Sequence, residues 1–159
     1  MSDMNTYENI LRVTLSDLIS KGVTSSIFGD IFLEDLRLFR ETKLSELKIK
    51  AVFSLWQLPT EKLVREFIAL GFKAITTCVD EQFLDKSFVG RMIDTDFLKD
   101  LPKNVDSCGE NGEFHSFVFD GPIFKNPVQF EIGEKVLKKY SNSTHGFWFC
   151  DLISLRSVL

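Results

Sequence analysis

The densest group of side chains that could do chemistry lies in residues 106–116 of this 159-residue chain. Two glycines, Gly109 and Gly112, flank Glu110 and Asn111 there. Glycine lets a backbone adopt positive φ and approach a ligand closely, and successive amides in such a turn can bind an anion. The spacing therefore predicts a tight turn that could hold a polar or anionic group.

A carboxylate and an imidazole follow this turn, two residues apart. Side chains alternate between the two faces of a strand, so Glu113 and His115 are predicted to share a face with Phe117 and Phe119. Such a pair could move protons or hold a polar ligand. A hairpin turn with a solvated Glu and His at its mouth is the commoner arrangement for these residue types. Both interpretations stay open.

A second group of charged residues lies where a predicted strand passes into a helix. Its members are Asp30, Glu34, Asp35 and Arg37. In open parallel sheets, ligands bind beyond the carboxyl ends of the strands, which is where this group falls. Helix capping, the helix dipole and pairing along one helix account for such residues more often. Taken alone, the second group favours a structural role.

The elements that must position these residues follow from hydrophobic spacing. Amphipathic helices are predicted at 6–21, 33–40 and 59–71. Buried strands are predicted at 23–28, 51–55 and 73–79, and longer aromatic strands at 113–121, 127–132 and 146–153. Strands separated by helices indicate right-handed crossovers in a parallel sheet. The predicted fold class is therefore α/β, a parallel sheet with flanking helices over 1–84 followed by a small β-rich subdomain over 85–159.

Composition excludes several classes of protein. The net charge is −4, from 19 basic and 23 acidic residues without a basic cluster, so nucleic acid is not an expected partner. No apolar run approaches the ~20 residues that cross a membrane, and no secretory signal is evident. Three cysteines without framework spacing indicate a reduced, cytoplasmic protein. The spacing of Cys108, His115, His145 and Cys150 does not fit a zinc site, so no metal site is expected.

The sequence also resembles a known family. Residues 109–116, Gly-Glu-Asn-Gly-Glu-Phe-His-Ser, and 120–124, Asp-Gly-Pro-Ile-Phe, closely resemble the signature of the diphthine–ammonia ligase-like family. That family belongs to the PP-loop ATPases, whose ATP-binding domain is adenine-nucleotide α-hydrolase-like. Supporting matches occur in the family's order at Gly29-Asp30-Ile31, Glu34-Asp35, Arg37, 53–56, 71–74, 78–80 and Gly90-Arg91. The resemblance covers about residues 5–133.

The resemblance implies an ATP-dependent amide-forming ligase, in which ATP adenylates a carboxylate and ammonia then displaces AMP. It implies ATP and Mg²⁺ as cofactors, and ammonia with a small-molecule or protein-borne carboxylate as substrates. The residues that the resemblance places in catalysis are Glu110, Glu113 and His115. Those that it places in substrate binding are Gly109, Asn111, Gly112 and Ser116. Those on the nucleotide or metal side are Asp30, Glu34, Asp35 and Arg37.

Two departures from the family's pattern shape the expectation. Asn111, Phe114 and His115 match the bacterial form of the signature, whereas archaeal and eukaryotic members, which act on diphthine, have Gly-Gly-Glu-Tyr-Glu-Thr; the substrate is therefore left open. The family's Ser-Gly-Gly-Lys-Asp-Ser loop, which holds the ATP phosphates, has no counterpart here. The chain is thus predicted to be the C-terminal portion of a ligase, or a non-catalytic binding domain that lacks the ATP loop. Because the first strands would be missing, a homodimer or a second subunit is expected to cover the open sheet edge.

Overall fold

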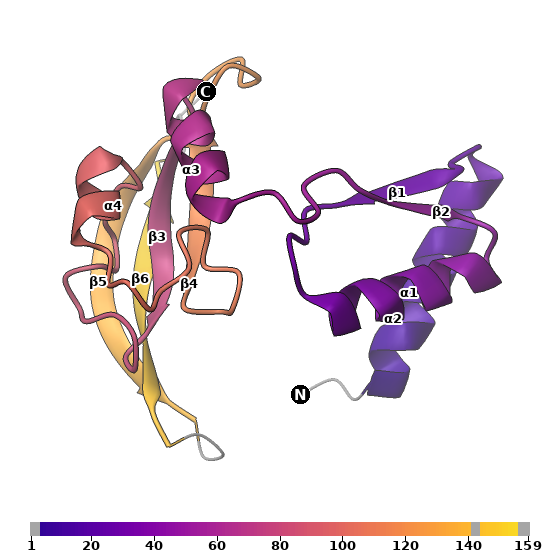
Figure 1. The fold of residues 1–159 in the computed structure, drawn as a ribbon, viewed down its shortest axis with the longest axis horizontal. Coiled ribbons are helices and arrows are strands. Elements are labelled where there is room, and N and C mark those ends of the chain that lie inside the picture. Colours follow the sequence, from indigo (N-terminus) through magenta and orange to yellow (C-terminus); the bar gives the residue numbers. More distant parts are fainter. Residues whose placement is uncertain (1–3, 141–143, 156–159) are drawn as a thin grey trace. The chain divides into compact units, whose positions relative to one another are not determined.

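The computed structural model describes residues 4–140 and 144–155. The chain divides into two compact units, Met1–Leu58 and Pro59–Leu159, called here the N-terminal and C-terminal units. The predicted α/β class is confirmed. A parallel pair of strands with helices forms the first unit, and a four-stranded antiparallel sheet with helices forms the second (Figure 1).

The N-terminal unit is a short α/β segment. Its elements are α1 (Met4–Ser20), β1 (Ser25–Phe28), α2 (Glu34–Glu46) and β2 (Lys50–Phe53). β1 and β2 are parallel, with Ile27 opposite Val52 and Phe28 opposite Phe53. Gly22 ends α1 with a φ of 89°, as expected from its position after the apolar spacing.

The core of the N-terminal unit lies on one face of this strand pair. Leu15 of α1 and Leu44 of α2 pack with Ile49, and Phe28 and Ala51 contact the same cluster. Alternation along the strands places Ile27 on the opposite face. Its side chain is 72% exposed. Parallel sheets are normally covered on both faces. Among the described residues, the face of this pair that carries Ile27 is exposed at that residue, and we call it the bare face.

The C-terminal unit is built on a curved antiparallel sheet (Figure 1). Its elements are α3 (Thr60–Ala69), β3 (Lys73–Asp80), α4 (Thr95–Asp100), β4 (Phe114–Asp120), β5 (Phe130–Lys139) and β6 (Gly146–Ser154). The strand order is β4-β3-β6-β5, and every neighbouring pair is antiparallel. β3 is therefore a central strand, and its residues are the most uniformly buried of any strand.

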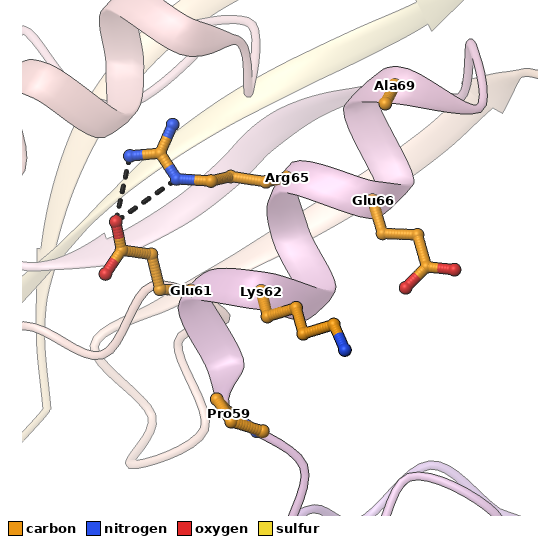
Figure 2. A pocket seen from close by; sticks show the side chains of 6 residues that line it. All are labelled: Pro59, Glu61, Lys62, Arg65, Glu66 and Ala69. Carbon is orange, nitrogen blue, oxygen red and sulfur yellow. Dashed lines mark hydrogen bonds and ion pairs between the residues drawn. The ribbon is translucent and has the colours of Figure 1, made fainter.

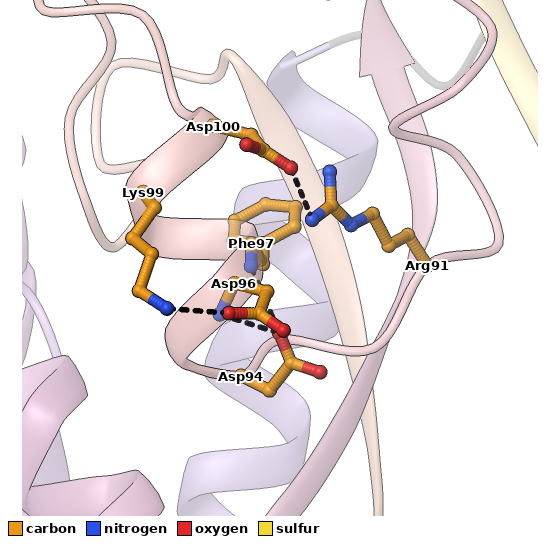
Figure 3. Close-up of polar contacts among 6 residues, drawn as sticks. All are labelled: Arg91, Asp94, Asp96, Phe97, Lys99 and Asp100. Carbon is orange, nitrogen blue, oxygen red and sulfur yellow. Dashed lines mark hydrogen bonds and ion pairs between the residues drawn. The ribbon is translucent and has the colours of Figure 1, made fainter.

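The core of this unit is centred on Phe97 of α4, which is fully buried against the rings of Phe88 and Phe114. Asp94 caps α4 by accepting the backbone N–H groups of Asp96 and Phe97 at 3.0 and 2.8 Å (Figure 3). Arg91 covers the solvent side of this aromatic cluster. Its guanidinium lies over the Phe88 and Phe97 rings and pairs with Asp100 at 2.6 Å. Arg91, part of the Gly90-Arg91 match to the family, thus belongs to the packing of α4.

Besides α2, which continues to Glu46 beyond the 33–40 expected, three features differ from the sequence-based expectation. The strand expected at 73–79 is present as β3, but it pairs antiparallel with β4 and β6 instead of extending the parallel sheet. An apolar run shows that a strand is buried, whereas the direction of its neighbours depends on residues far away in the chain. As a consequence, β3 belongs to the C-terminal unit, which begins at Pro59.

The other two differences are local. The strand expected at 127–132 is observed as β5, which continues to Lys139. Its length was underestimated because charged residues along this edge strand obscure its apolar alternation. The short helix α4 was not predicted, since six residues carry too little periodicity to detect. Among the described residues, no helix has both the length and the apolar character of a membrane-crossing segment.

Candidate functional site

Residues 106–113, which include the predicted turn, form a loop whose backbone is held by two carboxylates, those of Asp106 and Glu113. Asp106 Oδ1 accepts the backbone N–H groups of Cys108 and Glu110 at 2.9 and 3.1 Å. Glu113 Oε1 accepts the backbone N–H of Asp106 at 2.9 Å and the side-chain amide of Asn111 at 3.0 Å. Glu113 Oε2 accepts the backbone N–H of Asn111 at 3.0 Å. Both ends of the loop are therefore tied to the Glu113 carboxylate.

Glu113 is almost completely buried, with 1% of its surface exposed. Three hydrogen bonds from donors within one loop satisfy this buried charge, which would otherwise be costly. The carboxylate therefore acts as the anchor of the loop. The sequence analysis did not anticipate this anchoring, nor the part of Asp106, because neither follows from residue types or spacing alone.

The structure places His115 in different surroundings from Glu113. Glu113 precedes β4 and faces into the loop, whereas His115 lies within β4 and is exposed. Phe117 and Phe119, further along β4, pack edge-on against Phe130. The shared face predicted for Glu113 and His115 is not seen, because the loop draws the carboxylate inward before the strand begins.

The two glycines of the turn have the backbone that the sequence led us to expect. Gly109 has a φ of 71° and Gly112 a φ of 87°. At Gly109 a side chain would also collide, since a Cβ there would lie 2.8 Å from the carbonyl oxygen of Phe114. At Gly112 nothing lies within 4 Å of such a Cβ. Gly109 is thus required by conformation and by space, and Gly112 by conformation alone.

The carboxyl end of β3 adds further polar groups next to this loop. The backbone N–H of Asp80 donates to the carbonyl oxygen of Glu113 at 2.9 Å. The carboxylate of Asp80 pairs with His145, with 3.2 Å between Oδ2 and Nε2. Glu81, the next residue, accepts the backbone N–H of Gly146 at 2.6 Å. One end of the sheet therefore brings together the loop, Asp80 and His145, which are far apart in sequence.

A hollow adjoins the loop on the side of α3. It measures about 240 Å³ and is lined by α3, the end of α4 and residues 101–107, including Lys103 and Ser107. Glu61 and Arg65 also line it. Their side chains pair at 2.9 Å and face a second, neighbouring pocket along α3, which Figure 2 shows. Of the loop residues, Ser107 lines this hollow.

In the N-terminal unit, the charged residues after β1 are mostly engaged with one another. Asp30 Oδ2 lies 2.9 Å from Nε of Arg40 in an ion pair, and Nη2 of Arg40 donates to Asp30 Oδ1 at 3.4 Å. Arg37 pairs with Glu41 at 2.9 Å, and its guanidinium lies over the Trp56 ring at 4.5 Å. These contacts give Asp30 and Arg37 structural roles within the N-terminal unit.

The remaining members of that group, Glu34 and Asp35, are exposed in the first turn of α2. In the part of the chain that the structure describes, no three His, Cys, Asp or Glu side chains gather in a way that could hold a metal ion. Mg²⁺ that arrives with a nucleotide usually needs only one or two protein carboxylates, which Glu34 and Asp35 could supply.

The thiol of Cys108, a residue of the loop, is expected to be unreactive. Burial, and then the charges of Asp106 and Glu110, raise its pKa from 9.0 to about 11, and Sγ donates to the carbonyl oxygen of Thr60 at 3.4 Å. Since only the thiolate is nucleophilic, alkylation at pH 8 should be about 100-fold slower than in the unfolded chain and should accelerate as the pH approaches 11. Peptide mapping after timed iodoacetamide labelling, with a urea-unfolded sample as control, measures this. Labelling at the unfolded rate would contradict it.

The C-terminal unit is similar to a known protein family. A family model described as the diphthamide synthase C-terminal domain matches residues 59–153. The match starts at the same residue as the C-terminal unit. It includes β3, the loop, β4 and nearly all of β6. The organised loop and the Asp80–His145 pair therefore both lie inside the matched region.

Curated relatives support the same likeness. The mouse (Mus musculus) protein named diphthine–ammonia ligase is 33% identical over 102 residues, which are 61% of this chain and 38% of the relative. The proteins of the same name from Rattus norvegicus and Homo sapiens are 32% and 31% identical over 114 residues, 69% of this chain and 43% of each relative. The chain thus spans about two fifths of the length of these relatives.

Proposed function

Because this chain belongs to the diphthamide synthase C-terminal domain family, we propose that it is the C-terminal portion of an ATP-dependent amide-forming ligase. In the proposed reaction, ATP activates a carboxylate as an acyl-adenylate, and ammonia then forms the amide and releases AMP. The names of the curated relatives, diphthine–ammonia ligases, support ammonia as the nucleophile.

The observation that carries the proposal is the carboxylate-anchored loop of residues 106–113. Its two positive-φ glycines and its internal hydrogen bonds present Glu110 and Asn111 in a fixed arrangement beside β4. A site held rigid by the surrounding hydrogen bonds is what orientation of a substrate requires. The loop and the start of β4 carry residues 109–116, the first part of the family signature.

We propose roles for these residues accordingly. Glu113 positions the loop through Asn111 and Asp106, in keeping with its three internal hydrogen bonds. Glu110 and the exposed His115 contact the substrate or move protons. The substrate-binding residues are Gly109, Asn111, Gly112 and Ser116.

The ATP phosphates are proposed to bind outside this chain's described residues. Triphosphate needs several backbone or cationic donors. In the N-terminal unit, Arg37 and Arg40 are taken up by ion pairs and aromatic rings. We propose that an ATP-binding part, in a longer polypeptide or a second subunit, docks on the bare face or edge of the β1–β2 pair. Glu34 and Asp35 would then lie on the nucleotide and metal side.

The substrate is proposed to be a carboxylate borne by a small molecule or a protein. The relatives' names indicate diphthine for those proteins, and the Asn111-to-His115 sequence differs from the form that the family uses for diphthine. The amidation would take place in the cytoplasm, as the reduced cysteines led us to expect.

Exchange of pyrophosphate into ATP tests the proposal, because acyl-adenylate formation is reversible. The chain is assayed together with its ATP-binding part, and candidate carboxylic acids, diphthine among them, are added one at a time. We expect exchange that depends on both Mg²⁺ and an acid, and consumption of ammonia in the complete reaction. Absence of exchange with every acid, combined with absence of ATP binding, would favour the non-catalytic binding domain instead.

A further inference from the structure

A carboxylate–imidazole pair lies at the end of the sheet beside the loop. Asp80 Oδ2 is 3.2 Å from Nε2 of His145, and the side chains of Asp80 and His145 are 9% and 25% exposed. The other carboxylate oxygen, Oδ1, accepts the backbone N–H of Gln82 at 2.9 Å, so the carboxylate is held from two sides. The imidazole is thus oriented by a buried charge and still reaches the surface.

The strands around the pair hold it in place. Glu81 exchanges hydrogen bonds with Gly146, donating its N–H to the Gly146 carbonyl at 3.1 Å and accepting the Gly146 N–H at 2.6 Å. Lys139, at the end of β5, lies 3.5 Å from the same Glu81 carboxylate and is the nearby cation. The His145 ring also packs against Phe147, with 5.3 Å between ring centroids. β3, β5 and β6 all contribute to fixing this position.

The pair is also one hydrogen bond from the loop. The backbone N–H of Asp80 donates to the carbonyl oxygen of Glu113, whose carboxylate anchors Asn111. The strand end that carries the pair is therefore joined directly to the backbone at the end of the loop.

We propose that His145, oriented by Asp80, is the base that converts ammonium into ammonia in the amidation step; this rests on the function proposed above. Ammonia in neutral water is mostly ammonium, which has no lone pair with which to attack. A histidine held by a carboxylate is the common device for taking a proton near pH 7. Nothing in the loop itself supplies an equally oriented imidazole, because His115 is exposed on β4.

The route of the proton follows from the ring's contacts. Nε2 faces the Asp80 carboxylate, so we assign the basic role to the other ring nitrogen, Nδ1, which lies 3.5 Å from the hydroxyl oxygen of exposed Thr144. Ammonium gives a proton to this hydroxyl, which passes its own to Nδ1. The ammonia lone pair then forms the C–N bond, and the C–O bond to AMP breaks with its electron pair on the AMP phosphate. The second proton leaves the nitrogen to the phosphate or to water.

Hydroxylamine distinguishes this role from a structural one, because it is a neutral nucleophile at pH 7 and needs no deprotonation before attack. In the complete ligase, His145→Gln keeps a donor for Asp80 but cannot carry the proton. We expect ammonium-dependent amidation to fall by about 100-fold or more. Hydroxamate formation and pyrophosphate exchange should change less than threefold. Asp80→Asn should show the same selective loss, and Asp151→Asn, an exposed carboxylate on β6, should show none.

The possible outcomes separate the two proposals. Equal loss with ammonium and hydroxylamine, or no loss with either, would overturn the role of His145 while leaving the ligase proposal standing. If the unmodified ligase shows no acid-dependent exchange, the proposed function fails and this role fails with it. Preserved exchange in His145→Gln also shows that the variant is folded.

Discussion

Replacing Glu113 by alanine is expected to destabilise the C-terminal unit by about 3–5 kcal/mol. The change removes the acceptor of three hydrogen bonds. The backbone N–H groups of Asp106 and Asn111, in a partly buried loop, then lose their hydrogen bonds to the Glu113 carboxylate. Glu113→Gln should cost less, about 1–3 kcal/mol, because its amide oxygen can replace Oε1 as an acceptor. The remaining cost arises because its amide nitrogen would face the Asn111 N–H, which is also a donor.

Urea unfolding followed by tryptophan fluorescence measures this effect. The chain has one tryptophan in each unit, so Trp56→Phe leaves Trp148 as a reporter of the C-terminal unit alone. Glu131→Ala, an exposed carboxylate on β5, is the matched control and should change the unfolding free energy by no more than about 0.5 kcal/mol. If Glu113→Ala behaves like this control, the carboxylate does not anchor the loop.

Replacing Gly109 by alanine should destabilise the same unit by about 2–5 kcal/mol. Part of the cost is the positive φ of 71°, which disfavours any residue with a Cβ. The remainder comes from the Cβ itself, which would lie 2.8 Å from a backbone oxygen of Phe114. Because that oxygen belongs to the first residue of β4, relief of the collision would have to shift the strand or the loop.

Gly112→Ala separates the two contributions. It has a similar φ of 87° but open space around the added Cβ, so it should lose only the conformational part, about 1–2 kcal/mol. The same fluorescence measurement compares the pair. Equal losses in the two variants would mean that the approach of Gly109 to Phe114 is not tight.

Much of the fold could be predicted because its signals are local. The spacing of apolar residues placed α1, α3, β1, β2, β3, β4 and β6 within a few residues of their observed bounds. The glycine turn at 109–112 was also predictable, since positive φ is a property of the residue itself. β5 and α4 escaped because the first is a charged edge strand and the second is a single short helix.

The candidate site was predictable only in part. Residue types singled out Gly109, Glu110, Asn111 and Gly112, which the structure gathers in one loop. The pairing of Asp80 with His145 joins residues 65 positions apart, and no pattern in the sequence links them. Sequence spacing also put Glu113 and His115 together, and the structure separates them by burying one and exposing the other.

Interactions between neighbours along the chain set the order and type of most elements and the turn chemistry of the loop, and the family signature is likewise local. Long-range packing set three further features: β3 joins the antiparallel sheet, Glu113 anchors the loop from inside, and His145 lies beside a buried carboxylate. Each of these depends on which distant segments pack together, and on whether burial leaves a charge with enough hydrogen bonds to remain there.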